Sequence, residues 1–530
     1  MSDRPYADST PLQSKPVLPA GMAVAIWAAI LTVALGSLHF FYSRGLTQLY
    51  GDTFAHMEAA RRLFDSMTPG VPELGSVWLP MFHLLAAPLA INDHLWRTGL
   101  AGSLVSAAAF CLSAWFLFRL ALEMNGSVAA AFVALTAFLL CPSMFYLAST
   151  PMTEPLAILW AVLAVYGLLR YQMSGRTLCL AGAGVAAFFG TLTRYSEWYV
   201  LPFAALFILL ARKDSWCVRF RHAVMFSLIA GLGPVLWMLH NAVSYGNPIE
   251  FYNGPGSAEA IYAHQVATTA FRYPTGGSVL VSARYYIEDL KLIFGPWLLV
   301  LAVLGLMMWG LERRYRKRRA VTLLLLVQLP FYIQAMASAA VPIYVPTYFP
   351  HAYYNLRYGI EMLPAIALLV SFVVSPTFSQ NFRKGMLTAC VVVLCAQNVW
   401  MLAGGAQHLP VVKEGVLNTP CNTEPDRALI AFFRSHYDGQ RILMQSGEWP
   451  CVAPTLDIHY RRILSGDNLK YWRQIPGGAQ HFVEWIVAGQ GDPVDILIRA
   501  YPKAFKDFKL VYRRKFPDQQ SISIYRRKGG

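Results

Sequence analysis

Residues 51–62, GDTFAHMEAARR, bring several side chains that can do chemistry into one short segment. Asp52 can act as a general base toward a hydroxyl that comes within hydrogen-bond reach of its carboxylate. On local sequence alone the same residue is also a favoured helix N-cap. His56 lies four residues later and can share a helical face with Asp52. Arg61 and Arg62 can bind an anionic substrate or reach lipid headgroups.

Three further charged groups lie near the ends of apolar runs. Glu154 opens such a run, where a carboxylate is costly unless it is paired or used, although helix capping explains its position equally well. Arg194 lies in a tight turn between two apolar runs, and Arg357 precedes another, with Tyr358 beside it. A planar guanidinium suits phosphate oxygens. Contact with lipid headgroups is the other interpretation of both arginines.

Asp52 and Glu154 come from separate segments and could share one site. They would then act as base and orienting group, or as ligands of a divalent metal ion, so the metal is left open. No P-loop, GxGxxG, HExxH or GxSxG motif occurs in its required context, so a soluble nucleotide-sugar donor is not indicated. A membrane enzyme without a nucleotide site can still transfer a group from a lipid-linked donor.

The composition indicates that membrane spans position these groups. The chain has 530 residues, of which 56% are hydrophobic and 14% charged, against about 25% charged residues in soluble domains. The formal net charge is +15, and much of the excess lies in short loops between apolar runs, most densely at 313–319. This distribution is typical of cytoplasmic loops that face anionic lipid, and it argues against a nucleic-acid partner.

About eleven segments are apolar and long enough to be predicted as spans. The basic short loops place the N-terminus inside and the C-terminal segment outside. We therefore expect a polytopic α-helical protein of the inner (plasma) membrane, with a cytoplasmic tail at 1–20, a transmembrane domain at 21–403 and a first outer loop at 43–97. The predicted spans are 21–42, 98–118, 127–147, 153–170, 178–193, 196–211, 221–240, 291–311, 320–338, 359–375 and 385–403.

The first outer loop has the pattern of two surface helices, one within 47–65 and one within 76–89. The second segment is apolar but too short to cross a bilayer, which favours an interfacial or re-entrant helix. We expect Trp78 and His83 at headgroup depth, and Glu58 as a solvated charge.

Residues 404–530 lack further span-length runs and are predicted as a linker and a soluble outer α/β domain, periplasmic or extracellular. We expect helices at 425–436 and 480–488, and strands at 441–445, 494–498, 510–512 and 521–525. Cys421 and Cys451 both fall here. In an oxidising compartment they could pair, closing about 30 residues for roughly 3 kcal/mol, and two unrelated thiols are the equal alternative.

The chain resembles the GT-C glycosyltransferases, in the class that includes protein O-mannosyltransferases and aminoarabinose transferases. The resemblance covers about residues 20–400 and depends on the order of short motifs: GDTFAH at 51–56, AARR at 59–62, WLP at 78–80, TEP at 153–155, LTR at 192–194 and LRY at 356–358. Many relatives carry Asp-Glu where this chain has Asp52-Thr53, so Glu154 or His56 would supply the second function. The Trp-Trp-Asp motif of oligosaccharyltransferases is absent.

The resemblance implies transfer of a sugar from a polyprenyl-phosphate-linked donor to a lipid, glycan or protein acceptor at the outer face of the membrane. It implies that Asp52 is the general base of an inverting reaction, and that Arg194 and Arg357 hold the phosphate. A secondary transporter or lipid flippase is the alternative, but charges at span ends rather than near the midplane favour the enzyme. A membrane scaffold whose outer domain binds a partner is a third possibility.

Overall fold

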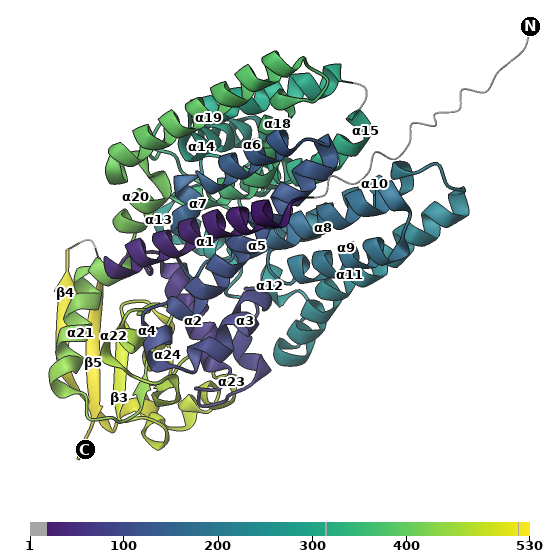
Figure 1. The fold of residues 1–530 in the computed structure, drawn as a ribbon. Helices are drawn as coiled ribbons and strands as arrows, with labels where there is room; N and C mark the ends of the chain where they lie inside the picture. Colours follow the sequence, from purple (N-terminus) through teal and green to yellow (C-terminus); the bar gives the residue numbers. More distant parts are fainter. Residues whose placement is uncertain (1–17, 313–314, 518, 530) are drawn as a thin grey trace, which may run out of the picture.

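The structure is a computed structural model that describes residues 18–312, 315–517 and 519–529. The predicted cytoplasmic tail lies almost wholly outside the described residues, as do Arg313 and Arg314 of the basic run. The described chain forms a large helical bundle with a small mixed α/β domain at one end, beside the helices of residues 51–97 (Figure 1).

Within the described residues, eight helical segments are long and apolar enough to cross a membrane. They are α1 (Ala20–Ser43), α5 (Leu100–Asn125), α8 (Glu154–Ser174), α11 (Trp216–Tyr245), α14 (Val279–Leu311), Arg316–Ala337 (α15 to α17), Leu356–Val374 (η3, α18 and η4) and α19 (Gln380–Ala403). The shorter apolar helices α6 (Val128–Leu139), α9 (Thr177–Thr191) and α10 (Ser196–Ala211) occupy the remaining predicted spans. The prediction of a multi-pass helical membrane protein is confirmed, with eight rather than about eleven segments of full length.

A kink divides α14, which begins twelve residues before the span predicted at 291–311. Gly295 adopts a left-handed φ of 70°, and Pro296 follows it. The kink frees backbone groups, which must be satisfied in an apolar environment. Gln397 of α19 satisfies them: its Oε1 accepts two backbone N–H groups at 3.1 Å, and its Nε2 donates to the Phe294 carbonyl at 2.6 Å.

The segment predicted as the first outer loop, 43–97, contains α2 (Gly51–Arg62), α3 (Met81–Ala90) and α4 (Asp93–Arg97), so both predicted helices are present. Two expectations about their side chains are wrong. His83 is fully buried rather than at headgroup depth, because it packs against His56. Glu58 is buried rather than solvated, because the C-terminal domain covers α2 and Ser446 donates to the Glu58 carboxylate at 2.5 Å.

The C-terminal domain is built on a five-stranded sheet with the order β2-β1-β3-β5-β4. Its strands are β1 (Ile442–Leu443), β2 (Ile463–Leu464), β3 (Trp485–Gly489), β4 (Phe508–Phe516) and β5 (Gln519–Arg527). β1 pairs in parallel with β2 and β3, whereas β5 is antiparallel to β3 and β4. The amphipathic helix α21 (Glu424–His436) packs Phe433 against Trp485 at a ring separation of 5.6 Å.

The structure corrects two predicted elements of this domain. The expected strand at 494–498 is the helix α24 (Pro493–Ala500), which Asp492 caps by accepting the Asp495 N–H. The helix expected at 480–488 is instead the end of a short 3-10 helix (Ala479–His481), an irregular stretch and then the strand β3, whose five residues are all buried. A short continuous apolar run in the middle of a sheet cannot be distinguished from a buried helix by periodicity.

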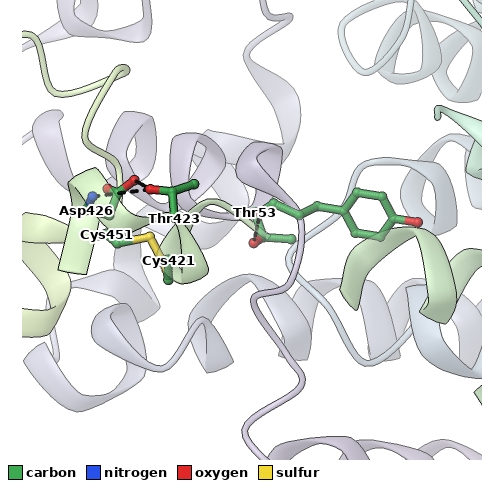
Figure 2. Close-up of a disulfide and its surroundings, with 6 residues drawn as sticks. Thr53, Cys421, Thr423, Asp426 and Cys451 are labelled. Carbon is green, nitrogen blue, oxygen red and sulfur yellow. Dashed lines mark hydrogen bonds between the residues drawn. A yellow bond between two sulfur atoms is a disulfide. The ribbon is translucent and has the colours of Figure 1, made fainter. Parts of the chain in front are cut away.

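Cys421 and Cys451 form a disulfide (Figure 2). It joins the segment before α21 to the residue preceding α22 (Val452–Leu456). Beside it, the Thr423 hydroxyl accepts the Asp426 N–H at 3.2 Å and caps α21. Of the two alternatives that the sequence left open, the structure contains the paired one.

Candidate active site

Asp52 lies in the first turn of α2, and Tyr50 rather than Asp52 occupies the N-cap position. The N-cap interpretation from local sequence is therefore wrong. The Asp52 carboxylate instead forms an ion pair with Arg357, and its side chain keeps 38% of its surface exposed. An acid that is both held by a cation and accessible can meet a substrate.

Arg357 is the centre of the cluster and is only 5% exposed. Its Nη2 pairs with Asp52, and its Nε donates to Glu154 Oε1 at 3.1 Å. The guanidinium also lies over the rings of Tyr50 and Tyr358, at 5.0 and 4.9 Å from their centroids. Such burial excludes a lipid-headgroup role for Arg357 in this arrangement.

The segment that carries Arg357 is held in place by Glu414, which lies in the linker that follows α19. Asn355 has a left-handed φ of 58°, which positions the start of η3 (Leu356–Met362). Glu414 of α20 (Pro410–Leu417) accepts the backbone N–H groups of Asn355 and Leu356 at 2.7 and 2.9 Å. Burial raises the pKa of Glu414 to about 7, and the positive charge of Arg357 opposes this increase.

Arg194 is the second basic residue of the cluster and lies in the turn between α9 and α10. It donates to Glu154 Oε1 at 3.1 Å, and its Nε lies 2.5 Å from Glu361 Oε1. Glu154 Oε1 therefore bridges Arg194 and Arg357, while Glu154 Oε2 is buried without a partner among the described residues. Tyr358 lies under Arg194 as well, at 4.8 Å.

The structure brings Asp52, Glu154, Arg194 and Arg357 together and adds two carboxylates that sequence reasoning missed. Glu361 lies four residues after Arg357 inside an apolar segment, the same signal that drew attention to Glu154. Glu414 lies in a mixed-polarity linker and gave no such signal. No group of three or more His, Cys, Asp or Glu suited to a metal ion occurs in the part of the chain that the structure describes.

His56 faces a second histidine. His56 Nδ1 and His83 Nε2 are 2.9 Å apart, and the rings of Trp78 and Phe82 lie 4.6 and 5.4 Å from that of His56. Burial, together with the positive charges of Arg357 and Arg194, lowers the pKa of His56 to about 3. Burial also lowers the pKa of His83. Both imidazoles are therefore neutral at physiological pH.

Arg61 and Arg62 do not join this cluster. Arg61 pairs with Asp65 at 2.8 Å and donates to backbone carbonyls at 90 and 91. Arg62 pairs with Glu73, with Glu58 at 3.3 Å and with Asp467 at 2.5 Å. Both guanidiniums are buried at the contact between α2 and the C-terminal domain, so we do not propose them as phosphate ligands.

No family model matches the chain, and neither does any curated protein sequence. Two solved structures of ArnT from Cupriavidus metallidurans are similar to it over nearly their full length. The structure bound to undecaprenyl phosphate has a TM-score of 0.56 at 13% identity, covering 96% of this chain and 98% of ArnT. The apo structure has a TM-score of 0.52 at 14% identity, covering 95% and 98%. The chain has the ArnT fold.

This likeness confirms the predicted GT-C architecture, a polytopic helical domain followed by a small α/β domain. A shared fold at such low identity does not specify a reaction. The function of this chain must be argued from the chemistry of its own site.

Proposed function

We propose that this protein is a glycosyltransferase that moves a sugar from a polyprenyl-phosphate-linked donor to an acceptor at the outer face of the inner membrane. One observation carries the proposal. The buried guanidinium of Arg357 and the partly buried guanidinium of Arg194 are both held by one carboxylate oxygen of Glu154, and Arg357 also pairs with the partly exposed acid Asp52. The similarity to ArnT bound to undecaprenyl phosphate supports it.

In this proposal the arginines bind the phosphate of the donor. Arginine forks match phosphate oxygens, and a low-dielectric surrounding strengthens the attraction. The Nη2 group of Arg357 now pairs with Asp52. A donor phosphate that takes this position frees the carboxylate, which can then accept a proton. Binding of the donor phosphate to Arg357 would thus free the Asp52 carboxylate to act as the base.

The proposed reaction is a direct displacement. Asp52 accepts the proton of the acceptor hydroxyl, and the acceptor oxygen forms a bond to the anomeric carbon of the sugar. The bond from that carbon to the phosphate oxygen breaks, and its electron pair leaves with the polyprenyl phosphate. Arg194 and Arg357 stabilise the charge that develops on the leaving phosphate. Attack opposite the leaving group inverts the anomeric configuration.

Glu154 and Tyr358 support this chemistry without reacting. The bridging oxygen of Glu154 fixes the spacing of the two guanidiniums. The ring of Tyr358 lies under both of them, so it restricts their movement and excludes water from one side. We propose His56 as a group that contacts the sugar or the acceptor.

The test uses purified protein, a panel of polyprenyl-phosphate sugars and parallel reactions with chelator. Asp52→Asn should abolish transfer while leaving a folded protein. Asp93→Asn is the matched control, because Asp93 also pairs with an arginine and is similarly exposed but lies outside the cluster. The product's anomeric configuration, read by NMR, tests inversion. Near-normal transfer by Asp52→Asn would refute the assignment. Movement of the lipid across proteoliposomes without sugar transfer would favour the flippase alternative.

A further inference from the structure

Two buried histidines share one hydrogen bond beside the proposed site. His56 comes from α2, four residues after Asp52 and therefore on the same helical face. His83 comes from α3 and is fully buried. Only one proton can lie between His56 Nδ1 and His83 Nε2, so one ring donates and the other accepts.

The histidine pair is attached to the loop that carries Arg194. The backbone N–H of Met81 donates to the Leu192 carbonyl at 2.9 Å. The Tyr195 hydroxyl donates to the Val77 carbonyl at 2.7 Å. These contacts hold the start of α3 against the 192–195 turn. The position of His83 is therefore fixed relative to the same arginine that belongs to the cluster.

The surroundings of His83 indicate which ring donates. His83 Nδ1 is buried and has no partner among the described residues. If His56 donated, His83 would carry its proton on Nδ1, as a buried N–H without an acceptor. Buried N–H groups without acceptors are rarer than unsatisfied acceptors. If His83 Nε2–H donates instead, the proton of neutral His56 lies on Nε2, which has no hydrogen-bond partner in the described chain.

We propose that His83 is a positioning residue that fixes the tautomer of His56, so that His56 Nε2–H donates a hydrogen bond to an oxygen of the bound glycosyl phosphate. This inference rests on the proposed function and adds a neutral donor to its two arginines. A neutral donor suits this position because a third positive charge beside Arg194 and Arg357 would be costly in a buried site. His56 then orients the donor and takes no proton during the reaction.

Substitutions at His83 separate positioning from packing. A glutamine amide can place an N–H donor near the position of His83 Nε2, so His83→Gln should keep kcat/KM within about threefold of wild type. His83→Leu removes the donor and should lower kcat/KM by about 10–100-fold. A packing role predicts the opposite order, because the site is fully buried and leucine is apolar. Equal or higher activity of His83→Leu overturns the proposal.

The matched control is His94→Leu, in the same outer loop. His94 also shares a hydrogen bond, with the Tyr42 hydroxyl at 2.9 Å, but it is exposed and outside the site. Its loss should leave kcat/KM unchanged. Loss of activity in this control equal to that in His83→Leu would overturn the proposal, because any disturbance of the loop would then explain both.

The tautomer is measured independently of activity. Solid-state ¹⁵N spectra of protein labelled in the imidazole rings, with His56→Leu used for assignment, should show His56 neutral and protonated at Nε2 from pH 5 to 8. His83→Leu should redistribute that signal, and undecaprenyl phosphate should shift it in wild type. A His56 protonated at Nδ1 overturns the inference. If no donor of the panel reacts, the proposed function fails, and the spectrum alone still decides the histidine arrangement.

Discussion

Replacing Arg62 with methionine should detach α2 from the C-terminal domain. The guanidinium is 7% exposed and pairs with two buried carboxylates, Glu58 and Glu73, and with the more exposed Asp467. Methionine fills much of the same volume but leaves both buried acids without their cation. Removing one partner of a buried ion pair costs about 3–5 kcal/mol, since the remaining charge stays desolvated.

The cost should depend on pH in a defined direction. Burial raises the pKa of Glu58, and Arg62 opposes this increase in wild type. Without Arg62 the folded-state pKa of Glu58 rises further above that of the unfolded chain. A raised carboxyl pKa favours the folded state at low pH and loses that contribution as pH rises through it. Arg62→Met should therefore be less stable at pH 8 than at pH 5, relative to wild type.

Hydrogen exchange measured by mass spectrometry at α2 and residues 463–468 tests this. A loss of about 3–5 kcal/mol accelerates exchange through local opening by about 10²–10³-fold or more. Arg461→Met is the control, since Arg461 is 63% exposed and its guanidinium comes no nearer than 3.8 Å to the Asp65 carboxylate. Such an exposed pair contributes about 0–1 kcal/mol. Equal exchange in the two variants would refute the reasoning. We also expect Arg62→Met to lower transfer activity, because α2 carries Asp52.

Three other predictions concern separate parts of the chain. Burial raises the pKa of Glu414 to about 7, above its value in the unfolded chain, so its ionisation removes stability as pH rises from about 5 through 7; Glu414→Gln should flatten the fall in melting temperature over this range, and an unchanged slope would contradict this. Cys421→Ser with Cys451→Ser should cost the C-terminal domain about 3–4 kcal/mol, and reductant should lower the melting temperature of wild type but not of the double variant. A Cβ on Gly305 would lie 1.8 Å from a backbone carbonyl of α18 (Leu363–Ser371), whereas a Cβ on Gly310 would have no atom of another segment of the described chain within 4 Å. Gly305→Ala should cost about 3 kcal/mol and reduce the monodisperse protein recovered in detergent, and Gly310→Ala should not.

The membrane domain could be predicted because a bilayer demands long apolar runs and every predicted span contains apolar helix. The C-terminal domain was harder. The run at 485–489 is buried on both faces of a sheet and carries no alternating pattern, so helix and strand could not be distinguished. Residues 494–498 needed the Asp492 cap to be recognised as the start of a helix.

The members of the site were predictable where charge meets an apolar segment. Asp52, Glu154, Arg194 and Arg357 share this signal, and the structure joins them. Arg62 has the same composition around it but lies at the far end of a twelve-residue helix, about 15 Å along the axis from Asp52. The closeness of Arg62 to Asp52 in the sequence suggested a role in the same site. The fold instead places Arg62 at the contact between α2 and the C-terminal domain.

Segments that are far apart in the sequence meet at α2 and η3, and this sets an order of events during biogenesis. Asp52 is synthesised before most of the membrane helices, whereas Glu414, which holds the Arg357 segment, and Asp467, which holds α2, are synthesised only after the last of the long apolar helices, α19. A nascent chain can therefore have all its long apolar helices inserted in the membrane before Glu414 and Asp467 hold the segments that carry Arg357 and Asp52. We expect the arrangement of Asp52 and Arg357 to form completely only after the C-terminal domain has folded. A chain that is stalled on the ribosome or truncated before the C-terminal domain would therefore be inserted in the membrane but inactive.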